Sequence, residues 1–197
     1  MNVTEPDVLD RADMARLVEG KESALNALMD RHAGPLFGFL CRFVRDEDAA
    51  DDLAQETFVR VYQHRSDFKP GLKFSTWLFT IGANLARNHL RSRSRRPEES
   101  LETSGGDGGL SLGETLVSPG DSPDVHAQRM ERQEAVRHAV AELPEDLREA
   151  VLLCELEDRS IAEAAIILAT TGKAVESRLY RARQQLRSQF AKWLNRN

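Results

Sequence analysis

The chain has 197 residues, of which 41% are hydrophobic, 30% are charged and 6% are aromatic, and its formal net charge is −5. This length suits one large domain or two small ones, and the lack of period-two runs of Val, Ile and Thr argues against β-sheets. No stretch approaches the roughly eighteen apolar residues of a membrane span, and the acidic N-terminus lacks the apolar core of a signal peptide, so we expect an intracellular protein.

The sequence offers little for metal or catalytic chemistry. Cys41 and Cys154 lie far apart without CxxC spacing, and the five histidines form no HxxxH or HExxH pair. No paired catalytic carboxylates, Ser/His/Asp set or phosphate-binding loop is present. We therefore expect no cofactor, no metal ion and no enzymatic activity.

Charge is distributed in blocks along the chain. Residues 45–56 carry six acids against one arginine, whereas residues 60–96 carry nine Lys or Arg against Asp67 alone. Residues 97–124 carry seven acids and no base, and residues 173–197 carry seven bases against Glu176. Two basic blocks separated by an acidic spacer predict two contacts with a polyanion.

Residues 1–96 are predicted to form a first helical domain. Gly20 is typical of the residue that follows a helix, and Gly34-Pro35 predicts a break or kink. On the third helix, one face is apolar and the opposite face is acidic. The four helices are expected at about 10–20, 22–44, 46–64 and 75–93.

The segment 97–124, PEESLETSGGDGGLSLGETLVSPGDSPD, is predicted to be a flexible acidic linker. Half of its 28 residues are Gly, Ser or Pro, and it has few apolar groups to bury. The linker would separate the first domain from a second helical domain at residues 125–197. The predicted fold is therefore all-α, with two small domains.

The second domain contains the pattern of a helix-turn-helix. Pro144 suits the first position of a helix, Ser160 and Glu163 form a capping box, and Thr171 can cap the final helix. The stretch from Thr171 to Arg187 then has an apolar stripe and a basic flank, as a helix that reads the major groove requires. The candidate DNA-binding residues there are Lys173, Glu176, Ser177, Arg178 and Arg181.

Two segments resemble parts of a known family. DEDAADDLAQETFVRVYQHRSDFKPGLKFSTWLFTIGANLARNHLRSRSRR (46–96) is similar to region two of bacterial sigma factors. LPEDLREAVLLCELEDRSIAEAAIILATTGKAVESRLYRARQQLR (143–187) is similar to their region four. With only a linker between them, this layout resembles the extracytoplasmic-function (ECF) sigma factors, although Ala169 stands where family members usually have a glycine.

The resemblance implies a role in transcription initiation. Family members bind core RNA polymerase, direct it to promoters and help to open the duplex, and an anti-sigma factor often controls them. The acidic face of the third helix would dock on a coiled coil of the largest polymerase subunit. Those residues are Asp48, Asp51, Asp52, Gln55, Glu56 and Val59.

The fourth helix and the final helix would contact the promoter. The resemblance assigns the minus-ten element, and its melting, to Thr80, Asn84, Arg87, Asn88 and Arg91. It places a pocket for a flipped base in the loop from His64 to Phe74, whereas Phe68, Phe74 and Trp77 suit the core better. The resemblance assigns recognition of the minus-thirty-five element to the final helix.

Two other interpretations remain open at this point. A stand-alone helix-turn-helix regulator would explain residues 143–187 but leave the acidic third helix and the basic fourth helix without a role. A helical protein-interaction module would have no role in nucleic-acid binding. Binding to promoter DNA without polymerase would favour the first alternative.

Overall fold

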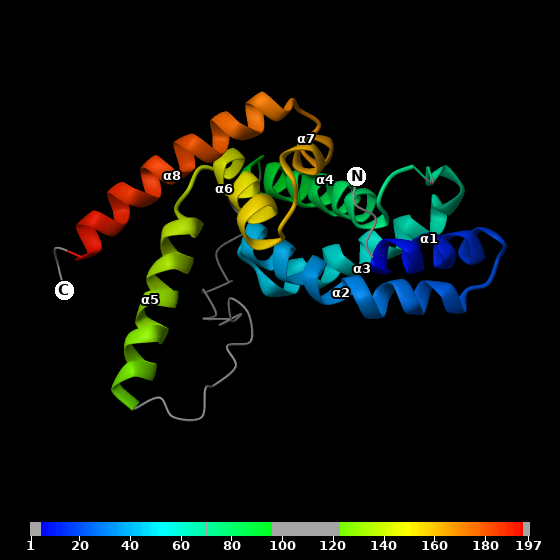
Figure 1. The fold of residues 1–197 in the computed structure, drawn as a ribbon, viewed down its shortest axis with the longest axis horizontal. Helices are drawn as coiled ribbons and strands as arrows, with labels where there is room; N and C mark the ends of the chain where they lie inside the picture. Colours follow the sequence, from blue (N-terminus) through cyan, green and yellow to red (C-terminus); the bar gives the residue numbers. More distant parts are fainter. Residues whose placement is uncertain (1–4, 70, 96–122, 195–197) are drawn as a thin grey trace.

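The computed structural model describes residues 5–69, 71–95 and 123–194, and every regular element within these ranges is a helix (Figure 1). A first unit contains α1 (Glu5–Val18), α2 (Ser23–Val44), α3 (Glu47–Gln63), the short η1 (Arg65–Asp67) and α4 (Phe74–Arg95). A second unit contains α5 (Pro123–Ala141), α6 (Glu145–Val151), the π-helical turn η3 (Leu152–Leu156), α7 (Ile161–Ile167) and α8 (Gly172–Leu194). The all-α prediction is confirmed.

The predicted linker lies outside the described residues, except for its last two, which begin α5. No helix in the described part of the chain combines the length and the apolar character needed to cross a membrane.

Local signals set the helix ends of the first unit. Gly20 has a φ of 89° and follows α1, as predicted, because glycine enters this left-handed region without a steric cost. The Asp46 side chain accepts a hydrogen bond from the backbone N–H of Ala49 at 3.1 Å and so caps α3. The predicted break or kink at Gly34-Pro35 is not a break, because α2 continues through Pro35, and the kink stays a prediction. Buried Leu28 and Leu36 anchor the helix on both sides of the proline.

The buried face of α4 is built largely from small residues. Gly82, Ala83 and Ala86 are buried there, together with Phe79. A Cβ at Gly82 would lie 2.9 Å from Cδ1 of Leu36, so α2 and α4 approach each other too closely for a larger residue. The glycine therefore allows α4 to pack closely on α2 at this point.

The second unit has the caps that the sequence predicts. Ser160 accepts from the backbone N–H of Glu163 at 3.2 Å, and the Glu163 carboxylate accepts from the backbone N–H of Ser160 at 3.0 Å. Thr171 Oγ1 accepts from the backbone N–H of Ala174 at 3.2 Å and caps α8. Pro144 lies one position earlier than predicted, at the N-cap of α6.

The two units pack against each other. Their buried side chains form one continuous hydrophobic cluster that includes Phe39 and Phe79 of the first unit and Leu152 and Ile167 of the second. The helix α7 packs on α4, and η3 packs on α2, while α5 extends away from this contact (Figure 1). The shared cluster holds the second unit over one side of α4.

Candidate nucleic-acid and protein interfaces

The acidic side of α3 is exposed along its whole length. The side chains that the sequence places on this face are all solvent-exposed: Asp48, Asp51, Asp52, Gln55, Glu56 and Val59. Gln55 Nε2 donates to Asp51 Oδ2 at 2.8 Å, and the Glu56 carboxylate accepts from Arg60 Nε at 2.8 Å. Val59 is 47% exposed and supplies an apolar contact beside the carboxylates. The surface suits a basic protein partner with an apolar spot.

A cavity of about 290 Å³ opens between α3, η1 and α4. Asn84 and Asn88 of α4 line it together with His64 and Asp67, and His64 Nδ1 lies 3.1 Å from Asp67 Oδ2. Trp77 forms part of the wall and packs on Phe68, with ring centroids 5.3 Å apart. The cavity combines an aromatic surface with amide donors and acceptors, which a nucleic-acid base can use.

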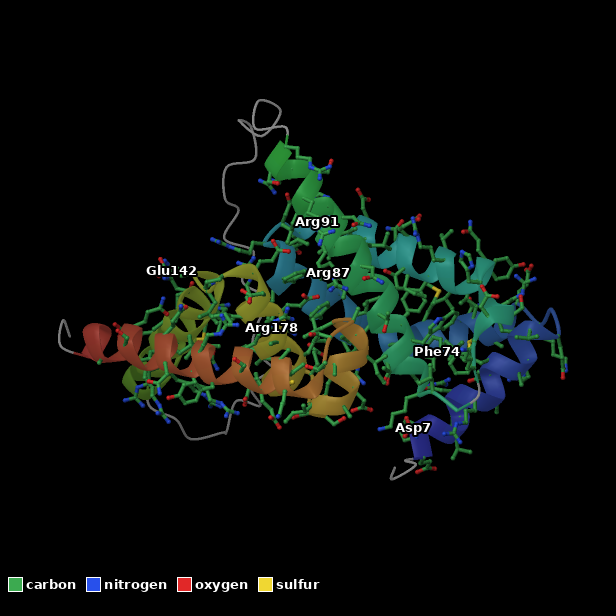
Figure 2. The ribbon with its side chains drawn as sticks, turned by 90° about the horizontal axis from the view of Figure 1, so that it is seen from above. Asp7, Phe74, Arg87, Arg91, Glu142 and Arg178 are labelled. Atoms are coloured by element: carbon green, nitrogen blue, oxygen red, sulfur yellow. The ribbon has the colours of Figure 1, made fainter. Side chains whose placement is uncertain are left out.

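The candidate DNA-binding residues of α4 differ in their surroundings, although Arg87 Nη2 donates to Asn84 Oδ1 at 2.5 Å. Asn84 and Asn88 line the cavity, and Arg91 is exposed towards the end of the helix. Thr80 donates its hydroxyl to the Thr76 carbonyl at 2.7 Å. Arg87 turns to the side of α4 that faces the second unit, whereas Arg91 lies clear of it (Figure 2).

Sequence reasoning missed several residues of the cavity. Arg60, Ile81 and Leu85 also line it. The spacing of Ile81, Asn84, Leu85 and Asn88 could have shown this, because residues three and four apart share one helix face.

The final helix α8 presents the predicted basic flank. Val175, Leu179 and Ala182 are buried, which fixes the orientation of the helix. On the outer side, Lys173, Glu176 and Ser177 are exposed, and Arg178 and Arg181 lie 3.8 and 3.7 Å from Asp146 Oδ2 of α6. The first turn is therefore open to DNA, and one carboxylate attracts both arginines.

Buried charges lie where the units meet. Burial raises the pKa of Glu149 to about 7, although the nearby Arg87 guanidinium opposes this shift. Burial likewise raises the pKa of Glu157, against the effect of Arg42. Burial lowers the pKa of Arg159, whose guanidinium lies 4.3 Å from the ring centroid of Phe79. Each shift follows from the cost of keeping an ion away from water.

Two family matches together cover more than half of the chain. Residues 28–96 match the family described as Sigma-70 region 2, and residues 133–186 match that described as Sigma-70, region 4. The first match covers the acidic face, the cavity and α4. The second covers most of the second unit, including α7 and the basic flank of α8.

Curated relatives and solved structures agree with these matches. The chain is 33% identical to the RNA polymerase sigma-H factor of Pseudomonas aeruginosa over 177 residues, which is 90% of this chain and 91% of that protein. It is 32% identical to the ECF RNA polymerase sigma-E factor of Haemophilus influenzae over 181 residues, covering 92% and 95%. The fold resembles that of CnrH in complex with the cytosolic domain of CnrY, with a TM-score of 0.68, 28% identity and coverage of 93% and 98%.

Proposed function

Because this chain belongs to the extracytoplasmic-function (ECF) family of RNA polymerase sigma factors, we propose which of its surfaces contact the polymerase and which contact the promoter during transcription initiation. The chain binds core RNA polymerase, directs it to promoters and promotes opening of the duplex. It has no catalytic role of its own and acts in the cytoplasm, where the polymerase and the chromosome lie. The first domain comprises residues 1–96, the linker residues 97–124 and the second domain residues 125–197.

The acidic face of α3 docks on the coiled coil of the largest polymerase subunit. Its carboxylates are solvent-exposed, so they attract a basic partner over a distance of about one Debye length and fix the orientation of docking. Val59 adds an apolar contact at the C-terminal end of this surface. Asp52 and Glu56 contribute most to docking, because they lie one helical turn apart beside Val59.

The cavity between α3 and α4 receives a base of the non-template strand. Unstacking a base costs a few kcal/mol, which stacking on the Trp77 wall and hydrogen bonds to Asn84 and Asn88 offset. Arg87 and Arg91 hold the neighbouring phosphates, because guanidinium groups bind phosphate oxygens with charge-assisted hydrogen bonds. This cavity, on the same unit as the docking face, is the observation that carries the proposal.

The first turns of α8 read the upstream promoter element. Arg178 and Arg181 can bond guanine O6 and N7, and Glu176 can accept from cytosine N4. Lys173 contacts a phosphate near the start of the helix, where the helix dipole favours an anion. Asp146 holds the two arginines in the free protein and releases them to DNA.

Run-off transcription with purified core polymerase tests this proposal. Added to core polymerase on a genomic DNA library, the chain should create specific start sites that core polymerase alone does not use. A stand-alone helix-turn-helix regulator would instead shift promoter DNA in a gel without polymerase. New start sites that require the chain support the proposal, whereas an unchanged transcript pattern contradicts it.

An anti-sigma protein is a further proposed partner, because the matched structure of CnrH is a complex with another protein, the cytosolic domain of CnrY. A cavity of about 440 Å³ lies between α2, α5, η3 and α8 and is lined by Val136, Val140 and Leu186. Arg45 and Arg183 also line it. An amphipathic helix with acidic flanks fits this combination of apolar lining and arginines.

A further inference from the structure

The cavity between α3, η1 and α4 is lined by hydrogen-bonding groups of different kinds. Asp67 contributes a carboxylate, which only accepts, whereas Arg60 contributes a guanidinium, which only donates. The amides of Asn84 and Asn88 each contain one accepting and one donating group. Because each nucleic-acid base has its own order of donors and acceptors along its edge, such a lining can distinguish one base from another.

Arg87 determines which part of the Asn84 amide is left for a base. Arg87 Nη2 donates to Asn84 Oδ1 at 2.5 Å. A guanidinium has no acceptor, so the carbonyl oxygen of the amide must be the atom that faces it. The amino group, Nδ2, is therefore the part of Asn84 that remains for a base in the cavity, and it acts as a donor.

Asp67 is an acceptor that no rotation can turn into a donor. His64 Nδ1 lies 3.1 Å from Asp67 Oδ2, so one carboxylate oxygen already has a partner in the cavity lining. The other oxygen, Oδ1, can accept from a ligand, and the side chain is 72% exposed and therefore open to one. An ionised carboxylate attracts the amino group of a base and repels its carbonyl oxygen.

Arg60 supplies a second donor to the cavity. Its Nε donates to Glu56 Oε1 at 2.8 Å, and the two terminal nitrogens of the guanidinium can donate to a ligand. Together with Asn84 Nδ2, the cavity therefore offers two donors and, in Asp67, one acceptor. The Asn88 amide can turn to suit either kind of partner, so it does not by itself select a base.

Among the four bases, cytosine matches this set of groups. Its Watson–Crick edge has one donor, the N4 amino group, followed by two acceptors, N3 and O2. Thymine has the O4 acceptor in place of the amino group and would place it against the Asp67 carboxylate. Guanine has one acceptor and two donors, which is the reverse of what the cavity requires. Adenine has one donor and one acceptor on this edge and would leave a donor of the cavity without a partner.

We propose that Asp67 selects the base that enters the cavity and that this base is cytosine. The carboxylate accepts from the N4 amino group, while Asn84 Nδ2 and Arg60 donate to the acceptors of the same edge. Trp77 stacks on the ring and contributes affinity without selecting a base. The inference rests on the proposed function, which places a base of the non-template strand in this cavity. It adds the identity of that base and the residue that selects it.

The test uses the full-length protein bound to core polymerase and labelled non-template single strands. The strands are taken from the opened region of a promoter that run-off transcription has identified. Cytosine, thymine and 2-pyrimidinone, which is cytosine without its amino group, are placed in turn at each position, and affinity is measured by fluorescence anisotropy. Asp67→Ala removes the acceptor. Asp30→Ala is the matched control, because it removes an exposed carboxylate that does not line the cavity.

At one position, the wild type should bind cytosine about 10-fold more tightly than either thymine or 2-pyrimidinone. Asp67→Ala should weaken cytosine binding and tighten thymine binding, so that the three affinities agree within about 3-fold. The gain for thymine follows because no carboxylate repels its O4. Asp30→Ala should retain the preference of the wild type. Circular dichroism checks the fold, and Asp67→Asn, whose amide accepts or donates alike, repeats the test if Asp67→Ala does not fold.

The absence of a position that prefers cytosine, or a preference that persists in folded Asp67→Ala, would overturn the inference. An equal loss of affinity for all three strands would also overturn it, since a merely structural role predicts that result. Run-off transcription separates these outcomes from a failure of the proposed function. Polymerase-dependent start sites would uphold the sigma role even if every base binds equally well, whereas a wild type that creates no start sites contradicts both.

Discussion

Arg87 Nε lies 3.7 Å from the carboxylate of Glu149, although the two residues belong to different helical units. Burial raises the pKa of Glu149 to about 7 from an ordinary 4.5, and Arg87 opposes the shift. The other charged groups that act on Glu149 are Arg178, which opposes the shift, and Glu145 and Asp146, which add to it. The protonated form of Glu149 therefore persists to near-neutral pH in the folded protein.

This pKa predicts that Glu149 makes the folded protein less stable as pH rises. Between pH 4.5 and about 7 the folded state holds a proton that the unfolded state releases, so the free energy of unfolding falls across this range. Glu149→Gln should remove that contribution and stabilise the protein at pH 8 by on the order of 1–3 kcal/mol. Urea unfolding of both proteins at pH 5 and pH 8 measures the difference, and an equal pH dependence would contradict the prediction.

Charge reversal on α3 should prevent polymerase docking. Asp52→Lys/Glu56→Lys places two cations on the surface proposed to meet a basic partner, so binding should fall below detection in a pull-down with core polymerase. Both residues are exposed, and the thermal unfolding temperature should not change. Glu19→Lys/Asp30→Lys makes the same change of charge on other exposed positions and should retain binding.

Removal of the two amides in the α4 cavity should impair promoter opening more than closed-complex formation. Asn84→Ala/Asn88→Ala removes hydrogen bonds that form only after a base has left the duplex. Permanganate footprinting of the opened region should show reduced thymine reactivity, while gel shifts of the holoenzyme on duplex promoter change little. The exposed Asn26→Ala on α2 is the matched control. Wild-type permanganate reactivity in the double variant would refute the assignment.

Arg178→Ala or Arg181→Ala should cost about 1–3 kcal/mol of holoenzyme binding if the residue reads a base. The loss should appear at one position of the upstream element, which competition with single-base promoter variants can locate. Arg187→Ala removes an exposed arginine from the opposite flank of α8 and serves as the control. A loss of equal size on every promoter variant would show phosphate binding instead of base recognition.

Ala169 strains the turn between α7 and α8. Its φ is 48°, a left-handed conformation in which the Cβ of an L-residue costs about 1–2 kcal/mol. Ala169→Gly relieves this cost, partly offset by the larger entropy of glycine in the unfolded chain, and should stabilise the protein by about 0.5–1 kcal/mol. Ala165→Gly, inside α7, should destabilise it by a similar amount. Chemical denaturation of both variants tests whether their changes in the free energy of unfolding have opposite signs.

Local signals in the sequence predicted the helices of the second unit well. The Ser160–Glu163 capping box and the Thr171 cap need only neighbouring residues, so the structure has both. The acidic side of α3 was equally accessible to prediction, because helical periodicity alone separates it from the buried side.

The orientation of α4 and the contacts between the units were harder to predict. The close approach of α2 buries Gly82 and its small neighbours on α4, and hydropathy does not indicate such a contact. The pairing of Arg87 with Glu149 depends on the packing of two distant segments. No periodicity or local spacing encodes such a contact.

The cavity beside Asn84 and Asn88 stays open to solvent even while the second unit covers Arg87. Because the recess exists before any DNA is bound, no free energy is spent on forming it. More of the stacking and hydrogen-bond energy then remains to hold a base that has left the duplex.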